Sequence, residues 1–423
     1  MLFQILDERK IIMYYRLNSD CLLIASDDSG IVYELANGKE HHITNKIEKD
    51  ILCLLEENVS IEELKDKYTN NNVINLLNTL KQNKLGRFFD TKVYIERIKP
   101  INMNFVKMGK TPLNNINRIA IELTGKCNLD CKFCSQEKIV YRKCGCKKWD
   151  YSHEFSDKKW QSVCEQIVKI SPKEIIFSGG EPLIRKNLFK ILCRKFYENN
   201  IKVKMFTNAT LINEEIALFL KEYNVDLAVH IISNNESLYD SITGKQGGYN
   251  LFKKGLELIA KHKINTIGVM LVNKYNINEY DKIKDEISSL KIEMQFQNEY
   301  NNDTSSELNS KIYDRNYSKI SINLFNYQVL TDYNNCLFGQ MFISNEGILY
   351  PCMMMRDFPL GDINNKKLWK IISESEYKKF WELSKSKIEK CCSCENRLSC
   401  FDCRAMEYYA TKNITGLKYC SKQ

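Results

Sequence analysis

Short apolar runs separated by polar turns open the chain, and helical spacing follows them. Two strand-like runs occupy residues 21–25 and 30–34, with a polar turn between them. Apolar positions then recur every three or four residues over three stretches: Ile47, Ile51, Leu54, Leu55; Ile61, Leu64, Tyr68; Val73, Leu76, Leu77, Leu80. Ser60, three residues before Glu63, has the pattern of a capping box. The pattern predicts two or three strands followed by three short helices, a small winged-helix-like α+β domain over residues 1–98.

Strands and helices alternate after a Pro-, Gly- and Asn-containing linker predicted at residues 99–117. Strands are expected at 118–123, 174–178, 202–207, 226–232, 266–272 and 292–297, and helices at 158–170, 188–198, 213–223, 251–261 and 277–289. Such alternation produces right-handed β-α-β units and a parallel sheet. Six strands fall short of a complete eight-stranded barrel, so residues 118–300 are predicted to form a partial (β/α)6 barrel of the α/β class. Its chemistry should lie at the carboxyl ends of the strands.

Composition narrows the possible partners. The 423 residues are 43% hydrophobic with a net charge of +9, which is modest at this size. Basic residues form no compact run interleaved with aromatic residues, so no nucleic-acid partner is expected. Apolar stretches stay shorter than the roughly 18 residues that span a bilayer, so no membrane association is expected either. We therefore expect a cytoplasmic protein.

The 17 cysteines are the most informative feature of the composition. Disulfides rarely persist in a reducing compartment, which makes metal or iron–sulfur ligation the leading explanation. Four cysteines stand singly among apolar residues and are interpreted as small buried hydrophobes: Cys21, Cys53, Cys164 and Cys193. Five others lie between Cys127 and Cys146, and eight follow residue 335. Two separate metal-binding regions are predicted.

The first region begins directly after the first barrel strand. Cys127, Cys131 and Cys134 are spaced C-x-x-x-C-x-x-C. Thiolates are the usual ligands of iron–sulfur clusters, and three of them leave one iron of a four-iron cluster without a protein ligand. The alternative is a zinc knuckle completed by Cys144 or Cys146. Both of those cysteines lie in a Lys-rich insert, residues 140–152, which could also be a lid or a substrate contact.

The context of this motif resembles the radical S-adenosylmethionine (SAM) superfamily. The cysteine spacing, the aromatic Phe133 and the segment Ser178-Gly179-Gly180-Glu181-Pro182 at the end of the second strand carry the resemblance. It implies a 4Fe–4S cluster that binds SAM and generates a 5′-deoxyadenosyl radical. By the same resemblance, the glycine segment holds the methionine amino group of SAM, and further positions contact the cofactor. The implied cofactor-binding residues are Phe133, Gly179, Gly180, Glu181, Pro182, Asn208, Ser233 and Asn273.

The second region, residues 336–423, resembles the SPASM domain, which carries two auxiliary iron–sulfur clusters. The resemblance rests on Cys336, Gly347, Cys352 and the paired cysteines from Cys391 to Cys420. It implies an outer cluster held by Cys391, Cys394, Cys400 and Cys420, and an inner cluster held by Cys336, Cys352 and Cys403. The candidates for the fourth ligand of the inner cluster are Cys392, Cys144 and Cys146. The alternative is a zinc ribbon made from Cys391, Cys394, Cys400 and Cys403.

The N-terminal domain resembles the leader-binding module of peptide-modifying enzymes, the pyrroloquinoline-quinone peptide chaperone family, although it could be a helical cap. With residues 301–335 as a bridging region, the chain is interpreted as a maturase of a ribosomally synthesised precursor peptide. Its expected partners are that peptide and an electron donor such as flavodoxin or ferredoxin. A cysteine thioether crosslink is favoured over carbon–carbon or carbon–oxygen crosslinking and epimerisation. Sulfatase maturases resemble the chain but typically have Asp where Met353 stands, and a non-catalytic metal or peptide-binding protein is the remaining alternative.

Overall fold

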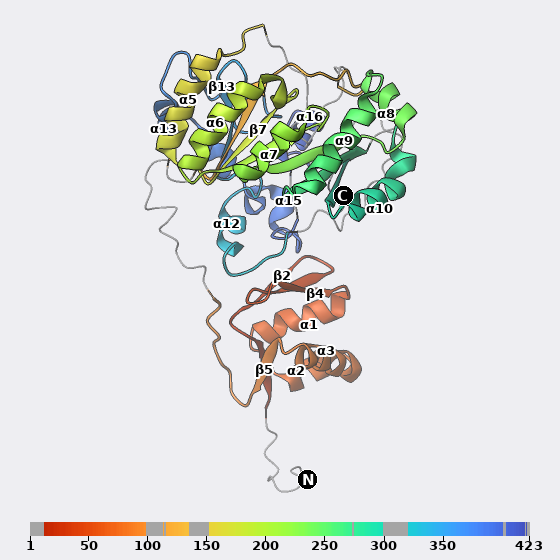
Figure 1. Ribbon diagram of the computed structural model, residues 1–423. Coiled ribbons are helices and arrows are strands. Elements are labelled where there is room, and N and C mark those ends of the chain that lie inside the picture. The colour runs from red at the N-terminus through yellow and green to blue at the C-terminus, as the bar shows by residue number, and fades with distance from the viewer. Residues whose placement is uncertain are drawn as a thin grey trace. The chain divides into compact units, whose positions relative to one another are not determined.

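The computed structural model describes residues 12–98, 113, 116–134, 152–272, 275–298, 320–400, 403–418 and 420. The chain divides into two compact units. The N-terminal unit comprises residues 1–105, 315–335 and 382–402, and the barrel unit comprises residues 106–314, 336–381 and 403–423. The cysteine-rich C-terminal region therefore contributes segments to both units. Figure 1 shows the ribbon, and each unit is described by itself below.

The N-terminal unit contains both predicted strands and all three predicted helices. Its three-stranded antiparallel sheet has the order β2-β3-β4, and a separate two-stranded sheet pairs β1 with β5. The elements are β1 (Tyr14–Leu17), β2 (Cys21–Ala25), β3 (Gly30–Glu34), β4 (Lys39–Ile43), α1 (Lys46–Glu56), α2 (Ile61–Lys67), α3 (Asn70–Gln82) and β5 (Gly86–Phe89). The capping box is confirmed: the Glu63 amide donates to the Ser60 hydroxyl, and the Ser60 amide donates to the Glu63 carboxylate.

The central strand β3 is buried on both faces, as expected for a strand covered by two layers. Val32 faces the core that the strand forms with α1, α2 and α3. Ile31 and Tyr33 face the opposite way and pack with Leu330 and Leu398. Leu330 belongs to α12 (Tyr327–Asp332), and Leu398 follows α15 (Glu389–Cys392). The second face of the small sheet is thus covered by residues more than two hundred positions away in the chain.

The barrel unit contains the six predicted parallel strands in sequential order. They are β6 (Arg118–Thr124), β7 (Glu174–Gly179), β8 (Lys202–Thr207), β9 (Asp226–Ile231), β10 (Thr266–Val272) and β11 (Glu293–Asn298). The predicted helices are α5 (Asp157–Ile170), α6 (Lys186–Glu198), α7 (Glu214–Glu222), α9 (Gly248–Lys261) and α10 (Tyr280–Ser289). The α/β fold with a parallel sheet is therefore confirmed. A further helix, α8 (Glu236–Thr243), had not been predicted.

The sheet continues beyond β6 into the C-terminal region. Strand β12 (Gln340–Ile343) pairs with β6 in parallel, and β13 (Ile348–Tyr350) and β14 (Gly361–Asp362) follow in antiparallel order, giving nine strands. The remaining elements are η2 (Pro182–Arg185), η3 (Ile277–Glu279), α13 (Leu368–Glu374), α14 (Tyr377–Trp381), η5 (Lys385–Lys387) and α16 (Arg404–Thr411). None of the described helices combines the length and the apolarity needed to cross a membrane.

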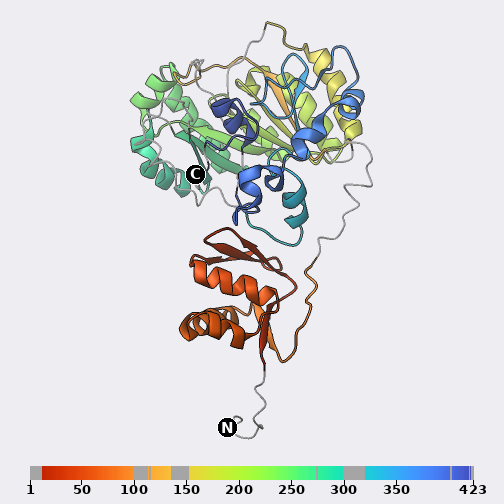
Figure 2. The same cartoon turned by 180° about the vertical axis from the view of Figure 1, so that it is seen from behind.

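The two faces of the parallel sheet have different surroundings. Helices α6, α7 and α9 cover one face in Figure 1, and Figure 2 shows the unit from behind. Phe177 faces the helices, where its ring lies 5.1 Å from that of Phe189 and 6.1 Å from that of Phe196, measured between centroids. Because side chains alternate along a strand, Ser178 and its partner Glu122 on β6 face the other side. Polar residues such as Glu122 and Ser178 therefore lie on the face opposite these helices, near the strand ends.

Packing of Phe177 predicts a large stability effect. Phe177→Ala removes a fully buried ring and leaves a cavity against α6, so the free energy of unfolding should fall by about 3–5 kcal/mol. Denaturant unfolding, followed by far-ultraviolet circular dichroism, measures the loss. The matched control is Phe325→Ala, whose ring is 88% exposed and which should change stability by less than about 0.5 kcal/mol. Equal effects of the two substitutions would contradict this packing.

Candidate active site and iron–sulfur regions

The first cysteine motif forms a loop at the carboxyl end of β6. Cys131 and Cys134 are buried, and Cys127 is partly exposed. The loop is braced by α8: the Asp130 amide donates to the Thr243 carbonyl at 2.8 Å, and the Lys132 amide donates to the Ile242 carbonyl at 2.9 Å. Helix α8, which the sequence patterns did not predict, thus holds the cysteine loop in place through these two backbone hydrogen bonds. Three thiols on one braced loop suit a cluster that needs three protein ligands.

The glycine segment packs against the same loop, backbone to backbone. A Cβ atom on Gly180 would lie 1.9 Å from the Lys126 carbonyl oxygen, so no larger residue fits. The Gly180 amide donates to the Thr124 carbonyl, and the Glu181 amide donates to the Lys126 carbonyl. A Cβ atom on Gly179 would likewise lie 2.2 Å from the Thr124 carbonyl oxygen, so the contact between the two loops requires both glycines. Their expected contact with SAM stays a prediction.

Glu181 joins the ends of two neighbouring strands. Its carboxylate is fully buried and accepts hydrogen bonds from the Leu183 amide, the Thr207 hydroxyl and the Asn208 amide, at 2.8 to 3.1 Å. Burial raises the pKa of Glu181 to about 7, and these donors only partly oppose the shift. The carboxylate thus holds the start of the β8 loop in place beside the cysteine loop.

Asn208 and Phe133 lie at the first cysteine motif, and their expected contact with the cofactor stays a prediction. The Asn208 side-chain amide lies 3.8 Å from the Cys127 sulfur and donates to the Asn128 side chain at 3.0 Å. The buried ring of Phe133 meets the His230 ring edge-on, with centroids 5.7 Å apart. Sequence reasoning missed His230, which projects from β9 without a local motif.

Ser233, Pro182 and Asn273 are the remaining residues that were expected to bind the cofactor. The Ser233 hydroxyl, buried after β9, donates to the Glu279 carboxylate and accepts from the Asn235 amide. Glu279 is thus a further acidic group near this strand end that the sequence analysis did not single out. Pro182 is buried at the first position of η2, which Glu181 caps. Asn273 lies outside the described residues.

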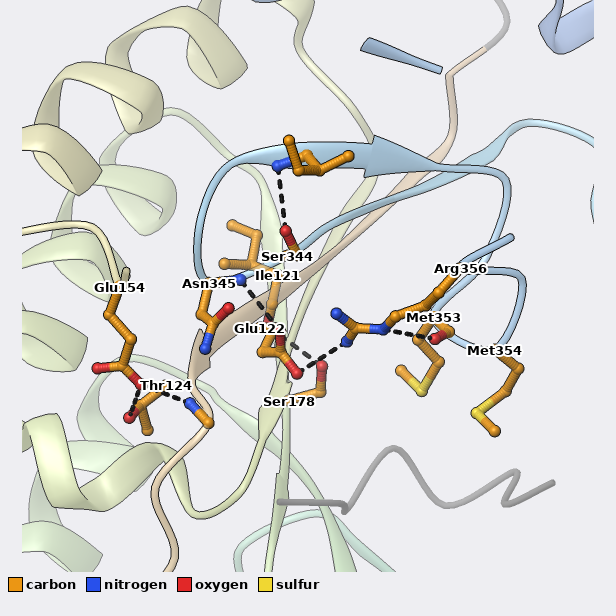
Figure 3. Close-up of polar contacts among 12 residues, drawn as sticks. Ile121, Glu122, Thr124, Glu154, Ser178, Ser344, Asn345, Met353, Met354 and Arg356 are labelled. Atoms are coloured by element: carbon orange, nitrogen blue, oxygen red, sulfur yellow. Dashed lines mark hydrogen bonds and ion pairs between the residues drawn. The ribbon is translucent and has the colours of Figure 1, made fainter. Parts of the chain in front are cut away.

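Two carboxylates, the half-buried Glu154 and the buried Glu122, hold the entrance to the cysteine loop (Figure 3). Glu154 accepts from the Thr124 hydroxyl at 2.7 Å and from the Gly125 amide at 2.6 Å, just before Cys127. Glu122, two residues earlier on β6, accepts from the Asn345 amide at 3.0 Å. The hydrogen bond of Glu122 connects the end of β6 to the turn after β12. The hydrogen bonds of Glu154 connect the same end of β6 to the segment before α5.

Glu122 also forms a buried ion pair with Arg356. The guanidinium donates to the Glu122 carboxylate at 2.8 Å and to the Met353 carbonyl at 3.3 Å. It lies over the rings of Phe342 and Tyr350, 4.9 and 5.7 Å from their centroids. Burial raises the pKa of Glu122, and Arg356 opposes that shift. Arg356 thereby ties the loop that carries Cys352 to the first barrel strand.

The three cysteines of the expected inner set, Cys336, Cys352 and Cys403, all belong to the barrel unit. Burial raises the pKa of the Cys352 thiol far above its usual range, and the charges of Cys403 and Cys336 raise it further. A Cys352 thiolate would thus be repelled by the thiolates of both other cysteines, and bound iron would relieve that repulsion. Their role as cluster ligands stays a prediction. Among the described residues, no three Cys, His, Asp or Glu side chains converge tightly enough to hold a single metal ion. A four-iron cluster holds its cysteines farther apart.

The expected outer set is divided between the units. Cys391, Cys394 and Cys400 lie in the N-terminal unit, where the Cys394 amide donates to the Cys391 carbonyl. Cys420 belongs to the barrel unit, so its ligand role stays a prediction. Cys392 is exposed. The alternative inner ligands Cys144 and Cys146 fall outside the described residues.

The raised pKa of Glu181 predicts a pH dependence of stability. The folded-state pKa of about 7 exceeds the ordinary value of 4.5, so the neutral acid stabilises the fold below about pH 4.5. That contribution is lost as pH rises through 7. Glu181→Gln is neutral throughout and should show a smaller loss of stability over this interval, measured as the thermal unfolding midpoint of the anaerobic protein. Parallel pH profiles of the two proteins would contradict the shifted pKa.

Comparison with known families and proteins agrees with this geometry. The Radical SAM superfamily matches residues 121–287, and the SPASM iron–sulfur cluster-binding domain matches residues 335–395. An AdoMet-dependent heme synthase of Methanosarcina barkeri is 27% identical over 339 residues, 69% of this chain and 92% of that protein. The radical SAM cyclopropyl synthase TigE of Paramaledivibacter caminithermalis is 31% identical over 159 residues, and this match covers 33% of TigE.

Solved structures show the same fold. The protein anSMEcpe with bound AdoMet superimposes with a TM-score of 0.55 at 19% identity, over 72% of this chain and 90% of the other. A second structure of anSMEcpe, with AdoMet and a peptide called Cp18Cys bound, gives a TM-score of 0.53 at 19% identity, over 72% and 93%. The two matches together span more than half of the sequence, and they contain the first cysteine motif and the second cysteine region as far as Cys394. This chain is a radical SAM enzyme with a SPASM domain, and its cofactors are SAM and iron–sulfur clusters.

Proposed function

We propose that this enzyme modifies a ribosomally synthesised precursor peptide. The observation that carries the proposal is the combination of three features in one chain. A radical-generating loop lies at the end of β6, a second cysteine set surrounds Cys352, and a small winged-helix-like domain precedes the barrel. The peptide-bound structure of anSMEcpe supports a peptide as the substrate class for this fold.

The barrel's own residues would hold the cofactors in place. When bound, the first cluster and SAM supply a deoxyadenosyl radical that removes a hydrogen atom from the substrate. Cys127, Cys131 and Cys134 would hold the cluster, and Gly179, Gly180 and Asn208 would shape the adjoining pocket. Buried residues such as Phe133 and His230 exclude water from beside the loop. Glu181 fixes the strand ends around this pocket, so the cofactor contacts are organised before binding.

The N-terminal domain would bind the leader segment of the peptide. In its sheet, β3 is covered on both faces, whereas β4 is an edge strand with exposed Lys39 and His42. An extended peptide can add to such an edge through backbone hydrogen bonds.

Among peptide modifications, a cysteine thioether is best supported. The inner set supplies three thiols, Cys336, Cys352 and Cys403, whereas a closed four-iron cluster needs four ligands. A substrate thiolate would take the remaining position and place its sulfur near a carbon radical. The thiol proton would leave when the sulfur binds iron, and forming the carbon–sulfur bond from the thiolate and the carbon radical would release one electron, which the auxiliary clusters would accept. An electron donor such as flavodoxin or ferredoxin would supply the first cluster.

One observation favours a second candidate, a porphyrin substrate. The heme synthase of Methanosarcina barkeri is matched over 92% of its length, more than any peptide-related similarity in sequence described above. Porphyrin binding is readily tested, because iron coproporphyrin has a strong absorbance band that shifts on binding. A saturable shift at micromolar protein would favour this candidate over the peptide.

The radical site is tested through Gly180. In Gly180→Ala the added Cβ collides with the Lys126 carbonyl and displaces the cysteine loop, so anaerobic cleavage of SAM to 5′-deoxyadenosine should fall roughly 100-fold or more. Chromatographic quantification of 5′-deoxyadenosine measures the rate. Gly30→Ala is the control, because its Cβ would have ordinary contacts of 3.4 Å. Replacing Cys127, Cys131 and Cys134 with Ala should abolish cleavage and leave the auxiliary iron. Cleavage that survives the triple change would refute the site.

The thioether proposal is tested by paramagnetic resonance. In protein lacking the three first-site cysteines, only auxiliary clusters report, and a Cys-containing precursor encoded near this gene should shift the inner-cluster spectrum. A precursor with Ser in place of Cys should leave it unchanged. With the intact enzyme, mass spectrometry should show loss of two hydrogen atoms per crosslink. Identical spectra with both precursors would contradict direct thiolate binding.

A further inference from the structure

The N-terminal sheet contacts the segment that carries the outer cysteines. The Tyr33 hydroxyl on β3 donates to the Glu395 carbonyl at 2.8 Å and shares a hydrogen bond with the Ser399 hydroxyl at 3.2 Å. The Ser29 hydroxyl donates to the Glu395 carboxylate at 2.7 Å. Around them, Ile31 packs in the same apolar core as Leu398. All of these residues belong to one compact unit.

Glu395 is unusual because it is buried beside a cysteine of the outer set. It follows Cys394 directly, is 4% exposed, and its second carboxylate oxygen lies 3.8 Å from the Cys394 sulfur. A protonated thiol can donate across this distance. A thiolate bound to iron cannot, so the carboxylate would then be a negative charge held against an anionic ligand. In a poorly solvated region such a charge acts strongly on its neighbour.

Charge near an iron–sulfur cluster shifts its reduction potential, as do hydrogen bonds and solvent exposure. A fixed carboxylate disfavours the added electron and lowers the potential. The position of Glu395 is set from the N-terminal sheet, since Ser29 holds the carboxylate and Tyr33 holds the backbone of the same residue.

We propose that Ser29 and Tyr33 are positioning residues for the outer iron–sulfur site, and that the N-terminal domain lowers the reduction potential of that site through Glu395. The inference rests on the proposed role of Cys391, Cys394 and Cys400 as ligands. Linkage makes the effect reciprocal: a domain contact that disfavours reduction is itself weakened when the cluster is reduced. Reduction of the outer site therefore loosens β3 from the cluster segment.

The decisive measurement is the midpoint potential of the outer cluster, in full-length protein lacking Cys127, Cys131 and Cys134. A redox titration followed by paramagnetic resonance gives the potential, and loss of the signal in Cys400→Ser assigns it. Glu395→Gln should raise the midpoint. The matched control is Glu389→Gln, which removes the same charge from an exposed position two residues before Cys391 and should have a much smaller effect.

A second pair of variants tests the positioning role without altering charge. Tyr33→Phe releases the Glu395 backbone, so the midpoint should rise toward that of Glu395→Gln. Tyr15→Phe is the control, because Tyr15 is equally buried in the same domain but packs in the core with the helices. If Glu395→Gln loses its outer iron, the comparison of Tyr33→Phe with Tyr15→Phe still tests the proposal.

Hydrogen exchange provides an independent readout of the coupling. In wild-type protein, amides of residues 30–34 should exchange faster after reduction, and Glu395→Gln should abolish the difference. The inference would be overturned if the midpoint potentials of Glu395→Gln and Tyr33→Phe moved no more than those of their control variants. It would also be overturned if hydrogen exchange did not respond to reduction. Either result would leave the proposed function intact. Wild-type protein without auxiliary iron would overturn the proposed function as well.

Discussion

The hydrogen-bonded pairing of β6 on both of its edges is the constraint on which both halves of the barrel unit depend. On one edge β6 pairs with β7, which leads to the glycine segment, and on the other it pairs with β12 of the SPASM region. Its carboxyl end leads into the cysteine loop. One strand therefore fixes the first cysteine motif relative to the loop that carries Cys352. Glu122, buried on this strand and paired with Arg356, strengthens the same connection. Removing either partner of a buried ion pair leaves an uncompensated charge, so the pair strongly specifies this arrangement.

Local patterns predicted most of the regular structure. The six parallel strands are apolar runs or, in β8 and β11, alternating polar and apolar residues, and the helices that follow them have strong amphipathic periodicity, so each could be recognised within its own segment. Strand β4 was missed because its sequence, Lys-Glu-His-His-Ile, lacks apolar alternation, and it is held in place by β3. Helix α8 is short and lies close to the longer α9, which dominated the pattern there. Strands β12 to β14 are too short to predict, because they have only two to four residues each, and β12 is held by β6, which is distant in sequence.

The candidate site was predictable where its residues are close in sequence. Cysteine spacing and the glycine segment are local motifs, and Asn208 follows a strand end in the expected register. By contrast, Glu122, Glu154, His230 and Arg356 act through partners on other elements, so a single sequence gives no signal for them. The buried state of Glu181 was also unpredictable. Its carboxylate is saturated by protein donors, and only the fold shows that it joins the strand ends.

The distribution of each unit over distant segments has a consequence for synthesis on the ribosome. The outer edge of β6 stays unpaired until residues 340–343 have emerged, and the second face of β3 stays uncovered until residues near Leu398 follow. Unpaired strand edges and uncovered apolar faces invite aggregation. Neither unit can be completed until nearly the whole chain has left the ribosome. The nascent chain therefore passes through a long interval in which its cysteines and its uncovered apolar faces are accessible.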